Sequence, residues 1–347
     1  MEMTQATQDS NFLSPAAAFD RGPEPRPRRQ DPSPGRSRAV SRLSALEGKH
    51  GLHIYKAWYF WLGCVVIFVD LSVLPVVYFY AFKFGTSLSM QDIFAIITAL
   101  FGMFCFIHYT FRCMRLVIIK TSAEKYRPLG WTKWGFLEFF HVNVGITVFL
   151  VEVELIVGTI PNYPFVRLCA MVPATIVFHY GFLLISSSIL ASMKKKLPFN
   201  MSSTPKGSPW KPALFAIIED FGAVEGSGES LYREQLMLRY EESWRFRRML
   251  NVLSWCWGVG LICDGIVATV LIMVCSETVG FGVGWGLPIV VCVAAGLVTY
   301  FYVRNALRKE EEGWHKMRCT TLPEGVEEAL GGGLEGSLEE ALEGSIA

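Results

Sequence analysis

Three acidic residues stand inside long apolar stretches of this sequence, where a carboxyl group could bind a cation or a proton. They are Asp70, Glu152 and Asp264. A charged side chain at the middle of a bilayer costs about 2.5–3.5 kcal/mol, so each acid must be protonated, hydrated or occupied by a cation. We therefore name them as candidates for a cation or proton site. The alternative is that they hydrogen-bond across helices as protonated acids, or face different ways.

Secondary polar candidates lie nearby in the same kind of stretch. Glu138, His141 and Glu152 fall within about 60° on one helical face, at 100° per residue, and this face is predicted to look inward. His179 is near the middle of another apolar stretch. A haem would need two facing histidines, and packed or interfacial histidines are the expectation here.

Other chemistry-bearing patterns are missing from the sequence. It has nine Cys but no CxxC pair, and no His-rich box or HExxH motif. No catalytic constellation, metal site or cofactor is predicted, and an enzyme is the least favoured class.

Helices must position these side chains, because six apolar runs divide the chain. Each run can hold the ~20 residues that span a hydrocarbon core of ~30 Å. The sequence therefore predicts an all-α polytopic integral membrane protein with a six-helix transmembrane bundle. The runs are roughly 58–82, 92–111, 136–158, 165–191, 250–275 and 283–303.

Positive charge orients this bundle. Of 32 Lys and Arg residues, 30 fall in the two termini and in the second and fourth gaps between the apolar runs, residues 112–135 and 192–249. The remaining two, Lys83 and Arg167, lie on the opposite side of the predicted membrane. Positive residues resist translocation, so both termini are predicted to be cytoplasmic. Asp70, Glu152 and Asp264 then lie at a similar depth, roughly 18–24 Å from the cytoplasmic ends of their helices at 1.5 Å per residue.

The predicted organisation has five parts. A disordered basic cytoplasmic tail (1–57) precedes the first four spans (58–191), and a cytoplasmic loop (192–249) precedes the last two (250–303). An acidic, Gly-rich cytoplasmic tail follows (304–347). The basic side is expected to contact anionic lipid headgroups. Nucleic acid is excluded as a partner, because the basic residues bracket helices and form no compact basic domain.

The loop contains one amphipathic helix, predicted over 229–249. Tyr232, Leu236, Tyr240 and Trp244 recur at i+4 and form one stripe. The helix could lie on the bilayer surface and lead into the fifth span. Alternatively, the stripe is a docking surface for a protein partner.

The same loop carries a family resemblance. The segment EDFGAVEGSGESLYREQLMLRYEESWRFRRML joins an acidic pair, a glycine-rich turn, Tyr-Arg, and then Arg-Tyr-x-x-Ser and Phe-Arg. It resembles uncharacterised multi-pass membrane proteins of filamentous fungi, over roughly residues 210–260. The resemblance implies a family but no catalytic role.

Two functional hypotheses follow for this multi-pass protein of unassigned activity. The first is a small cation- or proton-linked transporter that uses the intramembrane acids. The second is a non-transporting interaction or regulatory protein that acts through the 229–249 helix. Convergence of Asp70, Glu152 and Asp264 on one cavity would favour transport, whereas dispersed acids would favour interaction.

Overall fold

The computed structural model describes residue 69 and the ranges 73–119, 124–131 and 137–321, with the backbone alone for 314–321. Within these ranges the chain forms helices and two isolated β-bridges, Lys196 with Pro209 and Met201 with Thr204. The membrane-side helices are α3 (Leu74–Gly85), α4 (Met90–Cys113) with a π-helical extension η3 (Met114–Ile118), α6 (Phe139–Thr159), α7 (Val166–Ala170), α8 (Val172–Ser192), α11 (Trp244–Val274) and α12 (Glu277–Thr321). The loop helices are α9 (Ala213–Val224) and α10 (Glu229–Glu242).

Five of these helices are long and apolar enough to cross a membrane, which confirms the all-α membrane-protein fold. They are α4 with η3, α6, α8, α11 and α12. Of the first predicted span, the structure describes helix α3, while Asp70 lies outside the described residues, as do the 1–57 tail and residues 322–347. Large apolar side chains such as Phe106, Phe149 and Phe182 are exposed on the spanning helices. Such surfaces need lipid to cover them.

Two boundaries differ from those expected from hydropathy. Helix α11 begins at Trp244, where the side chain of Ser243 accepts a hydrogen bond from the amide of Phe246 (3.1 Å) and so caps the helix. Helix α12 begins at Glu277 and continues for 45 residues, about 67 Å, through residues assigned to the C-terminal tail. Apolar runs mark the part of a helix that lipid covers, whereas the helix itself continues until its capping groups or neighbours end it.

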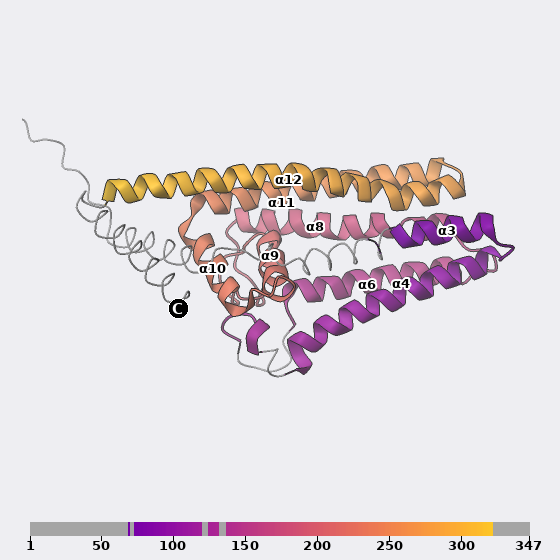
Figure 1. Ribbon diagram of the computed structural model, residues 1–347, viewed down its shortest axis with the longest axis horizontal. Helices are drawn as coiled ribbons and strands as arrows, with labels where there is room; N and C mark the ends of the chain where they lie inside the picture. Colours follow the sequence, from indigo (N-terminus) through magenta and orange to yellow (C-terminus); the bar gives the residue numbers. More distant parts are fainter. Residues whose placement is uncertain (1–68, 70–72, 120–123, 132–136, 322–347) are drawn as a thin grey trace, which may run out of the picture.

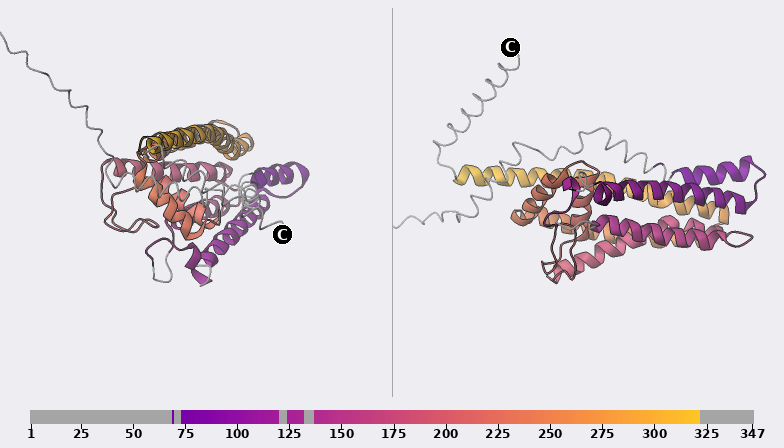
Figure 2. Two further views of the ribbon diagram at one scale, coloured as in Figure 1. Left: turned by 60° about the vertical axis from the view of Figure 1, so that its left-hand side comes forward. Right: turned by 90° about the horizontal axis from the view of Figure 1, so that it is seen from below.

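The helices pack in layers (Figure 1). Helices α11 and α12 form one layer, α8 lies beneath them, and α6 and α4 form the opposite side. Helices α9 and α10 gather at one end of the bundle, and the yellow end of α12 runs on past them (Figures 1 and 2).

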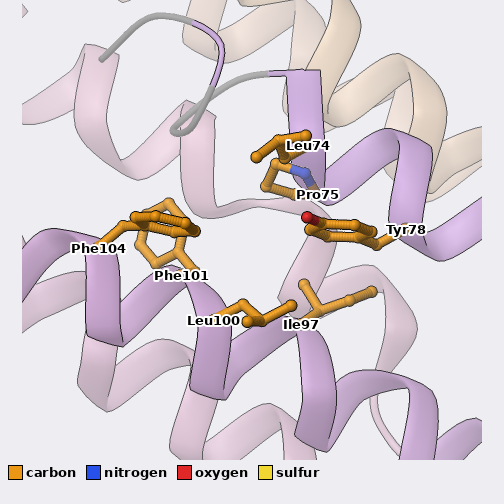
Figure 3. Close-up of a pocket in the computed structure, with 7 residues that line it drawn as sticks. All are labelled: Leu74, Pro75, Tyr78, Ile97, Leu100, Phe101 and Phe104. Atoms are coloured by element: carbon orange, nitrogen blue, oxygen red, sulfur yellow. The ribbon is translucent and has the colours of Figure 1, made fainter. Parts of the chain in front are cut away.

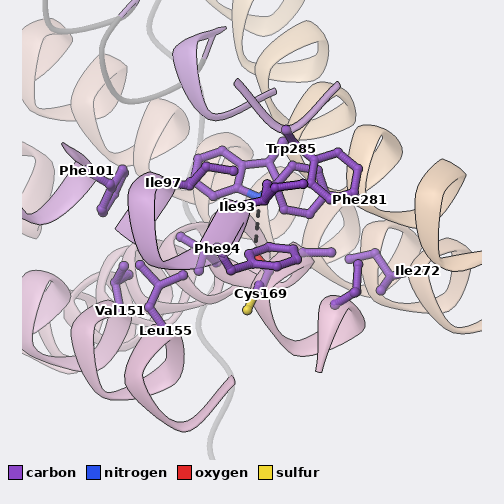
Figure 4. Packing of buried hydrophobic residues seen from close by; sticks show 14 of the residues in the cluster. Ile93, Phe94, Ile97, Phe101, Val151, Leu155, Cys169, Ile272, Phe281 and Trp285 are labelled. Atoms are coloured by element: carbon purple, nitrogen blue, oxygen red, sulfur yellow. Dashed lines mark hydrogen bonds between the residues drawn. The ribbon is translucent and has the colours of Figure 1, made fainter. Parts of the chain in front are cut away.

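An aromatic cluster closes the other end of the bundle (Figure 4). Phe79 stacks on Phe281 at 4.1 Å between ring centroids, and Phe94 meets Phe281 edge to face at 5.6 Å. The indole nitrogen of Trp285 donates a hydrogen bond to the carbonyl oxygen of Cys169 (3.2 Å), as the dashed line in Figure 4 shows. Buried aromatic pairs of this kind contribute about 0.5–1.5 kcal/mol each beyond the area they bury. The aromatic pairs join α3, α4 and α12, and the hydrogen bond of Trp285 fastens α12 to α7.

A small apolar hollow lies between α3 and α4 (Figure 3). Pro75 and Tyr78 line it from α3, and Ile97, Leu100 and Phe104 line it from α4. Its volume of about 10 Å³ is at the lower limit for one water molecule, so it is a packing defect with no room for a ligand.

Glycine residues bring α8 and α11 into close contact. A Cβ atom built on Gly258 would lie 2.7 Å from Cγ1 of Ile185 and 3.4 Å from the carbonyl oxygen of Gly181. A Cβ on Gly181 would in turn lie 3.2 Å from the carbonyl oxygen of Gly258. Small residues are the usual means by which membrane helices approach each other, because lipid supplies little hydrophobic drive for association.

This contact predicts opposite effects for two alanine substitutions in α11. Gly258→Ala is expected to destabilise the protein by about 1–3 kcal/mol, because its methyl group overpacks the contact with α8. Gly260→Ala should be neutral or stabilising, because no atom lies within 4 Å of its Cβ and alanine has the higher helix propensity. The measurement is the free energy of unfolding in mixed micelles titrated with SDS. Equal effects of the two variants would contradict the close contact.

Candidate functional site

The most strongly built polar site is a cluster of charged side chains where α9 and α10 meet the ends of α4 and α6. We call it the charge cluster, and it consists of Arg112, Glu138, Glu219, Asp220, Glu225 and Arg233. Four members, Glu138, Glu219, Asp220 and Arg233, are fully buried. A charge sealed from water at such a site needs both partners and hydrogen bonds.

Arg233 of α10 is the centre of the charge cluster. Its Nη1 donates to Oε1 of Glu219 (3.0 Å) and to Oδ1 of Asp220 (2.7 Å), both on α9. Its Nη2 donates to Oε1 of Glu138, at the start of α6, and to the carbonyl oxygen of Tyr126 (3.0 Å). One guanidinium group therefore joins three separate segments of the chain, which its planar, five-donor geometry makes possible.

Arg112 extends the charge cluster to α4. Its Nη2 donates to Oε2 of Glu138 (2.7 Å) and its Nη1 to Oε1 of Glu225 (2.6 Å). Its guanidinium carbon lies 5.0 Å from the ring centroid of Phe140, in cation–π range. Glu138 thus bridges two arginines, one from a membrane-spanning helix and one from the loop.

The acidic pair Glu219–Asp220 also holds backbone in place. Oδ2 of Asp220 accepts from the amide of Phe140 (3.0 Å) and from the hydroxyl of Ser202, and Oε1 of Glu219 accepts from the amide of Ser203 (3.2 Å). The two acids therefore dock the 200–204 turn and the first turn of α6 against α9.

A glycine-rich turn places Arg233 opposite the acids. A Cβ on Gly222 would lie 2.3 Å from the ring of Tyr232, and a Cβ on Gly228 would lie 2.5 Å from Cβ of Tyr232. Ser227 and Glu229 have φ of 53° and 55°, in the left-handed region, so the chain reverses sharply between α9 and α10. Tyr232 fills the space that the glycines leave, and its neighbour Arg233 faces the acids.

Carboxylates outnumber arginines in the charge cluster, four to two, and this sets its electrostatics. Burial, reinforced by the charge of Asp220, raises the pKa of Glu138 to about 8 despite its two arginine partners. The same causes raise the pKa of Glu219 to about 7. Oε2 of Glu219 is buried without a hydrogen-bond partner among the described residues, which suits a protonated oxygen. Burial and the repulsion among the acids therefore favour the protonated forms of Glu138 and Glu219.

The predicted interaction stripe is mostly covered within the chain. Tyr232 and Leu236 are 8% and 3% exposed, and both belong to a core with Phe215, Phe246 and Leu250. Tyr240 is half-buried against Phe215, whereas Trp244 is 56% exposed. The stripe packs α10 onto α9 and α11 because these helices present matching apolar faces.

The intramembrane acids lie at different helix contacts. Oε1 of Glu152 lies 3.0 Å from the Cβ position of Gly102 on α4, so Glu152 faces α4. Asp264 is 5% exposed and lies within electrostatic range of Cys292 on α12. Helix α8 packs between α6 and α11, and so separates the two acids (Figure 1).

The histidines face aromatic rings. His141 is fully buried and stacks on Tyr109 at 4.2 Å between ring centroids. His179 meets Tyr180 edge to face at 5.2 Å. Within the part of the chain that the structure describes, no group of three or more His, Cys, Asp or Glu side chains could hold a metal ion.

Sequence reasoning named one member of the charge cluster, Glu138, and missed the others as a site. The available signal was the segment from Glu219 to Arg233, in which an acidic pair and an arginine flank a glycine-rich turn. Arg112 gave no such signal, because in the sequence it is one of several positive residues that follow an apolar run.

Removing the central guanidinium tests whether the charge cluster holds the loop in place. Arg233→Ala leaves three buried carboxylates without their main partner, so we expect the free energy of unfolding to fall by about 3–5 kcal/mol. Arg308→Ala is the matched control, because it removes an exposed arginine paired with Glu312 at 3.2 Å and should change stability by less than about 1 kcal/mol. SDS titration in mixed micelles measures both. A similar small loss in both variants would contradict the central role of Arg233.

The raised pKa values also predict how stability depends on pH. The folded pKa of Glu219 lies above its ordinary value of 4.5, so this group's contribution is complete below about pH 4.5 and is lost as pH rises through about 7. Stability should therefore fall between pH 5 and pH 8 by an amount on the order of 2–3 kcal/mol from this group. Glu219→Gln keeps the acceptor at Oε1 but cannot ionise, and should reduce this slope. Glu242→Gln, at an exposed position, should leave the dependence of stability on pH unchanged. If both variants left it unchanged, Glu219 would not be its source.

Comparison with known proteins places the whole membrane region in one family. Searches of the curated proteins and of the solved structures return no match to this chain. A family described as Domain of unknown function (DUF8766) matches residues 55–314, a stretch that includes α3 to α11, most of α12 and every member of the charge cluster. The chain belongs to this family of uncharacterised proteins, DUF8766.

Proposed function

We propose that this protein is a non-enzymatic multi-pass membrane protein that presents a cytoplasmic platform to a protein partner. The charge cluster is the observation that carries this proposal. It ties α9 and α10 to α4 and α6 through Arg112 and Arg233, both almost fully buried. Helices that served only as a flexible link between spans would not need a buried, multiply bonded arginine, since burying ions without good partners is costly.

The orientation belongs to the same proposal. The distribution of Lys and Arg supports a cytoplasmic location for both termini and for α9 and α10. The sequence resemblance over residues 210–260 supports an origin of the family members in filamentous fungi.

The free face of α10 indicates the chemistry of the partner. Leu231, Glu234, Glu241 and Glu242 are exposed on the helix, on the side away from Tyr232 and Leu236. This face is acidic and includes one apolar side chain, that of Leu231. A partner segment with basic and apolar residues complements it, and charge complementarity of this kind supplies specificity and speeds association.

A second candidate function is cation- or proton-linked transport. The supporting observation is Asp264, whose two carboxyl oxygens are buried without a hydrogen-bond partner among the described residues. A cation or a proton would satisfy them. The separation of Glu152 from Asp264 by α8 weighs against a shared site, and for this reason we rank transport second.

Charge reversal on α10 tests the platform. We expect Glu234→Lys to reduce at least tenfold the recovery of partners cross-linked to the full-length protein in its native membrane, because like charges across the interface repel. Glu311→Lys, an equal reversal at an exposed position of α12, should leave recovery unchanged. Equal recovery with both variants would contradict the platform.

Proton or cation flux in reconstituted vesicles that is abolished by Asp264→Asn, Glu152→Gln or Asp70→Asn would favour transport instead.

A further inference from the structure

A basic hollow lies where α11 begins beside α12, separate from the charge cluster and from the exposed face of α10. Its volume is about 470 Å³, within the range of small-molecule sites. Arg245 and Arg248 line it from α11, and Lys309 lines it from α12. All three are exposed, so their charges face the hollow and the solvent.

The depth of this hollow matches the surface of a membrane. Its lining includes Trp244 and Tyr302, which are 56% and 39% exposed, beside Met249 and Ala306. Trp and Tyr concentrate at the level of lipid headgroups, where an apolar ring and a polar edge are both satisfied. The apolar stretch of α11 starts directly after Arg248, and that of α12 ends at about Val303. Cations therefore stand just above apolar side chains.

The hollow has fixed walls on two sides. Nη1 of Arg245 donates to the carbonyl oxygen of Lys309, which holds the two helices together there. A Cβ on Gly313 would lie 2.8 Å from that same Nη1, so Gly313 leaves the room that the guanidinium occupies. The acid in the lining, Glu312, accepts from Nε of Arg308 (3.2 Å), which offsets its charge.

We propose that this hollow binds the headgroup of an anionic phospholipid. The phosphate would meet Arg245, Arg248 and Lys309, and the start of the acyl chains would lie against Met249 and Tyr302. Arginine side chains hold phosphate through paired hydrogen bonds, and lysine adds a mobile charge. A soluble anion would use the cations but not the apolar wall, which is why a lipid fits this site better.

Lipid binding to the purified full-length protein tests the proposal by native mass spectrometry. The probes are phosphatidylserine and phosphatidylcholine, added in steps to the detergent-solubilised protein. We expect wild type to prefer phosphatidylserine, and Arg248→Gln with Lys309→Gln to lose about thirtyfold in affinity for it, at ~1 kcal/mol for each charge. Lys195→Gln with Lys196→Gln removes the same charge from an exposed part of the loop and should lose less than threefold.

Gly313→Ala distinguishes a defined lipid-binding site from general electrostatic attraction of anionic lipid to the protein surface, because this substitution changes no charge. Its methyl group should displace the guanidinium of Arg245 and reduce the affinity for phosphatidylserine about fivefold, with unchanged helical circular dichroism. The proposal would be overturned if the Lys195/Lys196 control lost as much affinity for phosphatidylserine as the Arg248/Lys309 variant, or if Gly313→Ala had no effect. Either result would mean that general surface charge attracts the lipid. Inorganic phosphate at millimolar concentration should not compete; effective competition would overturn the choice of a lipid.

Discussion

A guanidinium group that is sealed from water must be surrounded by acceptors, and the α9–α10 end of this protein is built around that requirement. Arg233 is fully buried and donates to Glu138, Glu219 and Asp220, which come from α9 and from the start of α6. These groups only meet if the loop folds back onto the bundle. The desolvation of the ions is offset by this dense bonding and would be uncompensated in any partly docked arrangement. The charge cluster therefore specifies one position for α9 and α10.

The excess of carboxylates gives this end of the molecule a property that an apolar contact would lack. With four acids around two arginines, full ionisation leaves net negative charge in a buried space, so the protonated forms of Glu138 and Glu219 are favoured. The opposite end is closed by Phe79, Phe281 and Trp285, whose contacts do not titrate. Changes in pH near neutrality are therefore expected to act on the charge cluster and not on the contacts among these three aromatic side chains.

Close packing in the membrane layer decides how the intramembrane acids are distributed. Gly181 and Gly258 let α8 and α11 approach until side-chain and backbone atoms touch. Helix α8 consequently fills the space between α6 and α11, with Glu152 facing α4 and Asp264 facing α12. Membrane helices with larger residues at this contact would stand further apart and could leave a shared polar space. The glycine contact thus keeps Glu152 and Asp264 at separate helix contacts, which supports the platform that we propose.

The long last helix connects the membrane layer to the surface chemistry. Helix α12 continues from the membrane past the start of α11, and its polar part carries Lys309 and Gly313 to Arg245 (Figure 1). A helix that ended with its apolar run would leave Arg245 and Arg248 as isolated surface charges. The basic hollow therefore forms because α12 stays helical beyond its apolar run.

The sequence by itself determined the fold class and the long apolar helices, and it predicts the sidedness of charge. These depend on local properties: about twenty apolar residues in a row must lie in lipid as helix, and Lys and Arg resist translocation. It also exposed the acidic pair, the glycine-rich turn and the arginine of the loop as a pattern. Only the tertiary structure decided that Arg112 and Glu138 complete this pattern, that Tyr232 and Leu236 are buried, and that Glu152 and Asp264 stand apart. Those outcomes depend on contacts between residues up to 113 positions apart, such as Arg112 with Glu225. Neither hydropathy nor helical periodicity contains information about which faces of two distant helices will meet.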